Sequence, residues 1–374
     1  MDITTSLTSE WSTNTAYTPS YNTDIPAWMN NGIDPMRFYF IIFKYVAPVL
    51  ILMGTIGNII SVVVLQSRFF RRAPSAFILS ALSLTDTGVL LCGLMRHWIK
   101  ALTQNKLNIR NLSQASCPVH FFFTYFLPQL SSWSLALLTV ERMSSVRWPF
   151  KAKELFSKPR MLSIWVVTAI ILAIINAQAF KTMILQPFTS TFDNTTVEYS
   201  CYRREESKHF FHFVWPWMDF FLISLLPMVI MVSCNVVIVM MLLKSRRMRK
   251  GQMQASCATD ESAAITAMLI GASVLFFLAT TPSSIYFIVL HYWPPKTSAQ
   301  KYVVNTAYSL VNIIYYLSNS LNFMVYCLSG SKFRRAFVAV LFCRDPKPQG
   351  SSVTSKYSLS TIEGTKAKSS SLPE

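Results

Sequence analysis

Long apolar runs alternate with short polar segments along most of the chain. Seven runs stand out: Phe40–Leu65, Ser75–Ile99, Ser116–Met143, Met161–Phe180, His212–Leu243, Asp260–Tyr292 and Val303–Leu328. Each contains a stretch of about 20 mainly apolar residues, the length that an α-helix needs to cross a bilayer. Lipid offers backbone groups no hydrogen-bond partner, so each run must be helical. The pattern predicts an all-α membrane protein whose residues 40–330 form a seven-transmembrane helix bundle.

The segments on either side of this bundle have a different character. Residues 1–39 are mostly polar and Ser/Thr-rich, which predicts a disordered tail and no cleavable signal peptide, so that the first span directs insertion. In residues 331–343, Phe333 and Phe337 alternate with Arg334 and Arg335 at helical spacing. This spacing predicts a short amphipathic eighth helix on the membrane surface. Residues 344–374 are rich in Ser, Thr and Lys, which predicts a second disordered tail and a substrate for kinases.

Charge sets the expected orientation. Only 14% of the residues are charged and 52% are hydrophobic, whereas soluble domains carry about 25% charged residues. The net charge of +17 could suggest nucleic-acid binding, but its distribution argues otherwise. With the N-terminus outside, about 21 Lys and Arg residues fall in inner segments and about 10 in outer ones. This positive-inside bias predicts a plasma-membrane protein with an extracellular N-terminus, a cytoplasmic C-terminus and no nucleic-acid partner.

Sequons and cysteines agree with that orientation. The glycosylation sequons begin at Asn111 and Asn194, both in loops placed outside. Of the seven cysteines, Cys117 and Cys201 are the two on the outer side, where an oxidising compartment would allow them to join. The other five are expected to be free thiols. Cys343, at the end of the amphipathic segment, is either a palmitoylation site or an idle thiol.

Embedded polar residues carry the candidate chemistry. Glu141 and Arg142 end the third apolar run, and charges near a bilayer are retained when they pair or have a function. Asp86 lies deep in the second run. The polar side chains expected at comparable depth are Asn58, Ser131, Asn319 and Asn322. Two interpretations stay open, a hydrogen-bonded packing network or a water-filled sodium (Na+) site, and both require Asp86 to face the interior of the bundle. No other cofactor is expected.

These residues occur together in one known family. The order of Asn58, Asp86, Cys117 with Cys201, Glu141-Arg142, Trp165, Pro227, Pro282 and Asn322-x-x-x-Tyr326 resembles the rhodopsin-like (class A) G-protein-coupled receptors from about Phe40 to Cys343. The resemblance implies a Cys117–Cys201 disulfide and a receptor that activates a heterotrimeric G protein. It further implies binding of arrestin and a receptor kinase through the C-terminal tail and contact with membrane lipid.

The resemblance also implies roles in switching. Arg142 would hold the inactive state through Glu141 and then turn to the G protein. Tyr326 would swing inward with Asn322. Pro282 would let the sixth helix move outward, with Phe276 packed beneath the ligand pocket. A mid-helix proline frees a backbone carbonyl and bends the helix, which serves either packing or hinge motion.

Within this family the chain is similar to invertebrate neuropeptide receptors for FMRFamide-like peptides. The similarity rests on the run Asn322–Gly330, in which Phe323 stands where the family usually has proline. Chemosensory and orphan receptors share this variant and remain the alternative. Two ligand classes are set aside. Thr124 occupies the position where amine receptors carry an aspartate, and Tyr316 occupies the position of the lysine of opsins.

The expected ligand site lies in the outer half of the bundle. The candidate residues are Arg96, Trp98, Thr124, Gln129, Asp219, Tyr286, His291, Tyr308, Asn312 and Tyr315. Our hypothesis is that Asp219 pairs a cationic ligand side chain, such as the arginine of an Arg-Phe-amide peptide, with aromatic rings around it. The alternative is an internal pair between Asp219 and a cation such as Arg96. Trp215 and Trp293 are expected to be interface anchors.

Two other classes of membrane protein fit less well. Transporters often show internal repeats around a midplane site, and the sequence contains none that we detect. An intramembrane enzyme needs a metal or nucleophile motif, and both H-E-x-x-H and G-x-S-x-G are absent. We therefore expect a receptor and not an enzyme.

Overall fold

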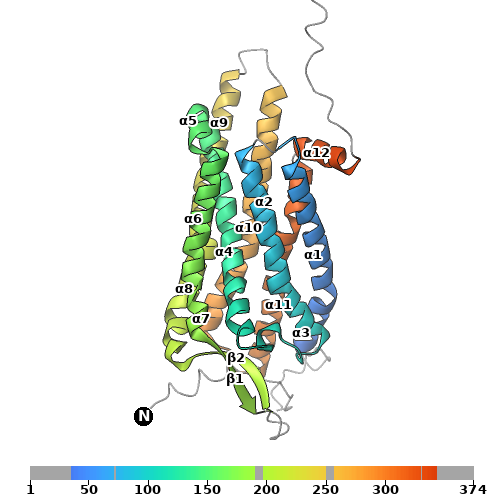
Figure 1. Cartoon of the computed structure of the whole chain (residues 1–374), viewed down its shortest axis with the longest axis vertical. Helices are drawn as coiled ribbons and strands as arrows, with labels where there is room; N and C mark the ends of the chain where they lie inside the picture. The colour runs from blue at the N-terminus through green and yellow to red at the C-terminus, as the bar shows by residue number, and fades with distance from the viewer. Residues whose placement is uncertain (1–34, 71–72, 190–196, 250–256, 330, 343–374) are drawn as a thin grey trace, which may run out of the picture.

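Long helices packed side by side make up most of the chain (Figure 1). The computed structural model describes residues 35–70, 73–189, 197–249, 257–329 and 331–342. The uninterrupted long helices are α1 (Pro35–Gln66), α4 (Ser116–Arg147), α6 (Lys158–Asn176), α10 (Cys257–Tyr292) and α11 (Ser298–Ser329). The second apolar run is divided into α2 (Pro74–Val89), η2 (Leu90–Leu94) and α3 (Met95–Leu102). The fifth apolar run is divided into η5 (Phe210–Val214), α8 (Trp215–Phe220), η6 (Phe221–Leu225) and α9 (Leu226–Arg249). The predicted all-helical fold is confirmed.

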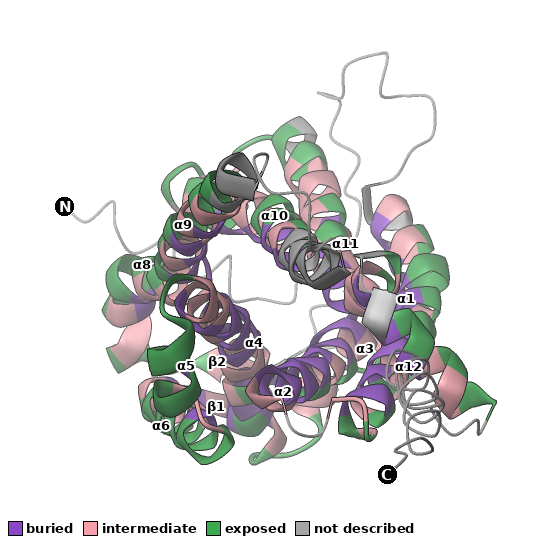
Figure 2. Cartoon of the chain, turned by 90° about the horizontal axis from the view of Figure 1, so that it is seen from above, coloured by how far each residue is buried: buried purple, intermediate pink, exposed green. Residues whose placement is uncertain are grey.

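Hydropathy places this bundle in a membrane. Among the described residues, six helical segments are long and apolar enough to cross a bilayer. The seventh long element, α11, packs along α1 and α10, and buries polar side chains such as Asn312 and Ser320 against them. Those polar residues lower its mean hydropathy. Buried faces point into the bundle, and the outer faces of α6 and α9 expose large apolar side chains (Figure 2). Such side chains suit contact with lipid.

Close packing of α1 against α11 depends on small residues. A Cβ at Gly54 would lie 2.9 Å from the Cα of Ser320, closer than real Cβ contacts. Ser320 also donates its hydroxyl to the carbonyl of Leu50 at 3.1 Å. In lipid, helices associate through such packing and interhelical hydrogen bonds. Burial of apolar side chains contributes little to helix association there, because the surrounding lipid is itself apolar. The two residues therefore bring the first and last long helices together.

One end of the bundle carries a β-hairpin that the apolar pattern did not predict. Strands β1 (Met183–Thr189) and β2 (Val197–Arg203) pair antiparallel, with Leu185 opposite Cys201. Cys201 is joined to Cys117 at the start of α4 by a disulfide with a Cα–Cα distance of 5.5 Å. The expected disulfide is confirmed. We call this end, which also contains η3 (Ile109–Asn111), the disulfide end.

The opposite end, which we call the α12 end, carries the short helices α5 (Pro149–Leu155) and α12 (Ser331–Leu341). Helix α12 buries Phe333 and Ala336 against the bundle and exposes Arg334 and Arg335. Arg334 donates from Nη1 to two carbonyls at the end of α11, those of Cys327 and Leu328, at 2.9 Å each. These bonds satisfy carbonyls that the helix itself leaves unpaired. Helix α12 occupies the segment of the expected eighth helix, and its role as an amphipathic helix on the membrane surface stays a prediction.

The remaining elements are short. They are α7 (Gln178–Thr182) and η4 (Glu205–Ser207), both near the disulfide end. Several predictions fall on residues outside the described part of the chain: residues 1–34 and 344–374 of the two tails, the sequon at Asn194 and the palmitoylation candidate Cys343. Residues 35–39, predicted as part of the disordered N-terminal tail, instead form the start of α1, because the apolar helix extends further back than the hydrophobic run alone indicated.

Candidate functional site

The charged pair at the α12 end is held in place from two sides. Arg142 Nε lies 3.3 Å from Glu141 Oε2, but the N–H does not point at the oxygen, so the contact is an ion pair without a formed hydrogen bond. Arg142 Nη2 donates to Ser75 Oγ on α2 at 2.6 Å, and Ser145 donates to the other oxygen of Glu141. The sequence pattern indicates the pair but not Ser75, which lies 67 positions away in the chain.

The middle of the bundle contains a buried carboxylate with two donors. Asp86 is 0% exposed and faces the interior of the bundle, as both interpretations required. Its Oδ1 accepts from the hydroxyl of Ser131 at 2.6 Å, and its Oδ2 accepts from the Nδ2 of Asn322 at 2.5 Å. Three helices, α2, α4 and α11, are thereby joined at one carboxylate.

Two other predicted members of this network do not contact Asp86. Asn58 donates to the backbone carbonyl of Asn319 at 3.4 Å, and Asn319 donates to the carbonyl of Tyr315 at 3.0 Å. The carboxylate and the hydroxyl of Ser131 are oxygen ligands of the kind that hard cations prefer. Asn322, however, turns its NH₂ group towards the carboxylate. The donor set therefore fits Na+ only in part, and this conformation favours the packing network.

The other predicted switch residues lie between this network and α12. Tyr326 is buried, packs edge-on against Phe333 of α12 and has no hydrogen-bond partner for its hydroxyl. Phe276 is partly buried against the apolar cluster at the α12 end. Pro282 lies inside α10, where a proline removes one helical hydrogen bond.

Towards the disulfide end, a second embedded acid is held by an amide chain. Gln129 on α4 is 0% exposed; its Nε2 donates to Asp219 Oδ1 on α8 at 2.9 Å, and its Oε1 accepts from Asn176 Nδ2 on α6 at 2.7 Å. Asp219 itself is half-buried. The structure therefore brings together two predicted ligand-site residues, Gln129 and Asp219, and adds Asn176, which the sequence analysis missed.

The internal pair of Asp219 with Arg96, kept as an alternative in the sequence analysis, is not formed. Arg96 donates from Nε to the side chain of Asn108 at 3.0 Å. Among the described residues, no cation lies within ion-pair distance of Asp219. The pair fails because Arg96 turns towards the loop before α4, whereas Asp219 lies on a helix that contacts α4 from another side.

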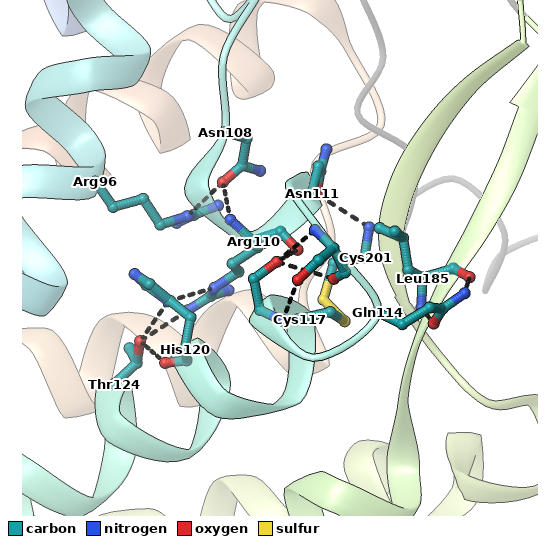
Figure 3. The surroundings of a disulfide bond; sticks show 12 residues. Arg96, Asn108, Arg110, Asn111, Gln114, Cys117, His120, Thr124, Leu185 and Cys201 are labelled. Carbon is teal, nitrogen blue, oxygen red and sulfur yellow. Dashed lines mark hydrogen bonds between the residues drawn. A yellow bond between two sulfur atoms is a disulfide. The ribbon is translucent and has the colours of Figure 1, made fainter.

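Arg110, which the sequence analysis counted only as a loop charge, reaches into the site. It donates from Nε to His120 Nδ1 and from Nη2 to Thr124 Oγ1, each at 3.1 Å (Figure 3). Burial, followed by the charge of Arg96, lowers the pKa of Arg110 to about 9, so the guanidinium stays cationic at neutral pH. The sequence signal that could have indicated Arg110 is its position as a basic residue shortly before Cys117.

A cluster of rings fills the neighbouring part of the bundle. His97 of α3 lies between two phenols, with Nδ1 3.0 Å from the hydroxyl of Tyr39 and Nε2 3.4 Å from that of Tyr308. Trp98 is partly buried beside this cluster. Tyr308 and Trp98 were predicted site residues, whereas Tyr39 and His97 were not. These rings form the wall of the site on the side of α1 and α11.

The remaining candidates have local partners. Tyr286 donates to the carbonyl of Val304 at 3.2 Å, and Asn312 donates to the carbonyl of Tyr308 at 2.8 Å. Tyr315 packs against the ring of Tyr316 at a centroid distance of 5.2 Å. The side chain of His291 lies outside the described residues. These contacts fix the wall of the bundle without joining Asp219.

One prediction about the aromatic residues was wrong. Trp215 is 3% exposed and packs between Tyr125 and Phe211, so it is a core residue rather than an interface anchor. The hairpin and the start of α4 cover it, which the linear pattern could not indicate. Trp293, in contrast, is 74% exposed, which is compatible with an anchor.

Two further features lie around the site. An apolar groove of about 590 Å³ runs between α10 and α11 and is lined by residues such as Pro282 and Val303. Its lining includes Tyr286 but neither Asp219 nor any other of the predicted ligand-site residues. Asn111 of the described sequon accepts from the backbone N–H of Cys201 at 3.1 Å. Its glycosylation stays a prediction.

Comparison with known proteins places the chain in a family. Residues 57–326 match the family described as 7 transmembrane receptor (rhodopsin family). No curated protein matches the chain significantly. The family match covers Asp86, Arg142 and Asp219, the disulfide and the apolar helices apart from the start of α1 and the last three residues of α11. Because it spans well over half of the chain, the protein belongs to the rhodopsin family of seven-transmembrane receptors, which are multi-pass membrane proteins that bind an extracellular ligand, signal through a G protein and are not enzymes.

Proposed function

We propose that the agonist is a peptide and that a cationic side chain of this peptide pairs with Asp219. One observation carries the proposal: Asp219 is a half-buried carboxylate within a membrane helix, its single hydrogen bond comes from the neutral Gln129, and no described cation pairs with it. A carboxylate in such surroundings loses hydration that one amide replaces only in part. A ligand cation would supply the missing charge.

The surroundings of Asp219 favour an aromatic ligand group as well. Tyr125 lies one helical turn before Gln129 on the same face of α4, and Gln129 donates to Asp219. Trp215 packs edge-on against Tyr125, with ring centroids 5.2 Å apart. Rings beside a carboxylate attract guanidinium groups through their faces and pack against ligand rings. A peptide that ends in Arg-Phe-amide offers both groups, which supports a neuropeptide of the FMRFamide-like class.

We further propose how binding reaches the G protein, with the disulfide end extracellular and the α12 end cytoplasmic. Arg142 leaves Glu141 and Ser75 and contacts the G protein, Tyr326 turns inward with Asn322, and α10 moves outward about Pro282. The poorly aligned Glu141–Arg142 contact and the unpartnered hydroxyl of Tyr326 support this mechanism, because both groups gain by moving.

The sequence also supports additional partners. The Ser/Thr-rich residues 344–374 suit a receptor kinase and then arrestin. A palmitoyl chain on Cys343 and the basic face of α12 would hold the α12 end to anionic lipid. Glycans on Asn111 and Asn194 would mark the extracellular side.

A peptide panel tests the function. Cells expressing the receptor are treated with amidated peptides, and calcium and cyclic-nucleotide responses are recorded together. We expect activation by a peptide with a C-terminal Arg-Phe-amide and no response from Arg142→Ala present at the cell surface in equal amount. Silence across the panel would contradict the neuropeptide class and favour a chemosensory ligand.

Substitutions of two acidic residues test the proposed contact between Asp219 and the ligand cation. Asp219→Asn should lower peptide potency about ten- to hundred-fold, because a charge-assisted contact is lost. Glu206→Gln removes an exposed acid at the same end and should leave potency unchanged. Equal potency of Asp219→Asn and the unsubstituted receptor would remove the direct contact from the proposal.

A further inference from the structure

Three cationic side chains gather at the disulfide end without an acid. Arg96 and Lys100 lie on α3 and Arg110 on η3, and all three are half-buried. No carboxylate among the described residues lies within ion-pair distance of any of them. Charges that lose hydration without a counter-charge are costly, and in or near a membrane they usually serve a function.

We propose that Arg96 and Arg110 form an anion subsite that binds a carboxylate of the ligand. The proposal rests on the proposed function, since it adds a second charged contact to the peptide that pairs with Asp219. It narrows the ligand class to peptides that carry both a cation and a nearby carboxylate. In a peptide that ends in Arg-Phe-amide the carboxylate belongs to an acidic side chain, whereas a carboxylate at the C-terminus would replace that amide.

The guanidinium of Arg110 is held in one orientation by neutral acceptors. His120 Nδ1 accepts from Arg110 Nε at 3.1 Å, while His120 Nε2 lies 3.0 Å from the carbonyl of Cys92. A carbonyl only accepts, so Nε2 carries the proton and Nδ1 is the acceptor. The imidazole is therefore neutral. It positions Arg110 without cancelling its charge, and Thr124 does the same at Nη2.

A single amide joins the side chain of Arg96 to the backbone of Arg110. Asn108 Oδ1 accepts from Arg96 Nε at 3.0 Å and from the backbone N–H of Arg110 at 3.3 Å (Figure 3). A guanidinium has about five N–H donors, and the described contacts engage only Nε of Arg96 and leave Nη1 of Arg110 unused. Forked N–H groups of this kind match the two oxygens of a carboxylate.

The distance between the two charged contacts suits a short peptide. Thr124, which accepts from Arg110, precedes Gln129, which donates to Asp219, by five positions on α4. Five helical residues rise about 7.5 Å along the axis and leave the two positions about 140° apart around α4, so the axial rise is a lower limit on the separation. One extended residue spans about 3.3–3.6 Å, so a carboxylate one or two residues from an arginine covers the axial rise, and the length of the arginine side chain must cover the offset around the helix.

Matched peptide pairs test the subsite on the purified full chain in lipid nanodiscs. The first pair is N-acetyl-Arg-Phe as the free acid and as the amide, which tests a C-terminal carboxylate. The second is N-acetyl-Asp-Arg-Phe-amide and its Asn analogue, which tests an acidic side chain. Affinity is measured from the shift in thermal unfolding on titration to millimolar concentration. In at least one pair, we expect the acid to bind about ten-fold more tightly or better than its neutral partner.

Variants assign that preference to the two arginines. Arg110→Gln and Arg96→Gln should each abolish the preference for the acid while the neutral peptide binds as before, which also demonstrates that the variant is folded. Arg110→Lys should keep part of the preference, because it keeps the charge but not the fork. Lys106→Gln, an exposed cation of the same loop, should keep all of it.

Two results would overturn the subsite. One is equal affinity for the acid and neutral members of both pairs in the unsubstituted receptor, including the case in which neither binds. The other is a preference that persists when Arg96→Gln and Arg110→Gln are combined. Asp219→Asn separates this failure from that of the proposed function. It should weaken both members of a pair equally if the cation contact exists, and weaken neither if only the anion subsite is real.

Discussion

Arginine side chains have different kinds of partner at the two ends of the bundle. At the α12 end, Arg142 is met by Glu141 and Ser75, and Arg334 by two helix carbonyls. At the disulfide end, Arg96 and Arg110 meet only neutral groups among the described residues. The first end uses its cations to hold its own helices, and the second leaves part of the donors of Arg96 and Arg110 without a described partner, as the proposed anion subsite requires.

The two ends also differ in what keeps them in place. A disulfide and a two-stranded hairpin fix the disulfide end, so its helices do not need ion pairs to stay together. The α12 end has no such covalent tie among its described residues and depends on side-chain contacts that a conformational change can break. A rigid ligand end and a switchable signalling end are what a receptor requires.

The largest expected effect comes from removing the covalent tie. Cys117→Ser combined with Cys201→Ser opens a link across a sequence separation of 84 residues. In the chain-entropy model, a disulfide that closes a loop of this length stabilises the folded state by about 4–5 kcal/mol. We expect most of the receptor to be lost from the cell surface and a lower unfolding temperature for what remains. Cys92→Ala, which removes a free thiol, serves as the control. Unchanged unfolding of the double variant would contradict the assigned rigidity of this end.

A smaller effect is expected in the middle of the bundle. Ser131→Ala removes a donor to Asp86 and should cost about 1–3 kcal/mol of unfolding free energy. Ser83→Ala removes another buried hydroxyl, one that has no partner among the described residues, so it should be neutral or stabilising. Denaturation of both variants in the same detergent gives the comparison. Equal losses would mean that packing alone, and not the Asp86 network, decides stability here.

A still smaller change should appear in signalling at the α12 end. Ser75→Ala removes one of the two contacts of Arg142, worth about 0.5–1.5 kcal/mol, so the active population should rise about two- to ten-fold. Ligand-free nucleotide exchange on the G protein measures it. Ser61→Ala, which removes a buried bond to a carbonyl of its own helix, is the control and should leave basal exchange unchanged. A Ser75→Ala receptor with normal basal exchange would show that Glu141 restrains Arg142 alone.

The smallest effect concerns an exposed contact at the disulfide end. Trp217 donates from Nε1 to the hydroxyl of Tyr292 at 2.9 Å, joining α8 to α10 at the surface of the bundle. Trp217→Phe should change stability by less than about 0.5 kcal/mol, because exposed bonds of this kind are replaced by bonds to water. Thermal unfolding in nanodiscs is the measurement. A large loss would mean that this surface bond, and not the disulfide alone, fixes the end.

Local pattern was enough for several parts of the site. Adjacent charges such as Glu141 and Arg142 are costly near a bilayer, so their presence alone indicated a function. Asp86 was recognisable for the same reason. Arg110 gave no such signal, because it lies in a polar loop where a cation is unremarkable. Only the fold of η3 over α4 reveals that it turns inward to His120 and Thr124.

The amino-acid sequence by itself determined that this chain is a helical membrane protein, because apolar length and embedded charge depend on composition along the chain. The receptor class followed from the resemblance of its motifs to a known family and from the family match. The tertiary structure alone decided which embedded charges meet. It separated Arg96 from Asp219, covered Trp215 with the hairpin and brought Ser75 to Arg142. The physical reason is that successive residues of an α-helix point in directions about 100° apart, so each one faces a different neighbour. The partner of a polar side chain therefore depends on how the helices are rotated and packed, which a linear pattern does not contain.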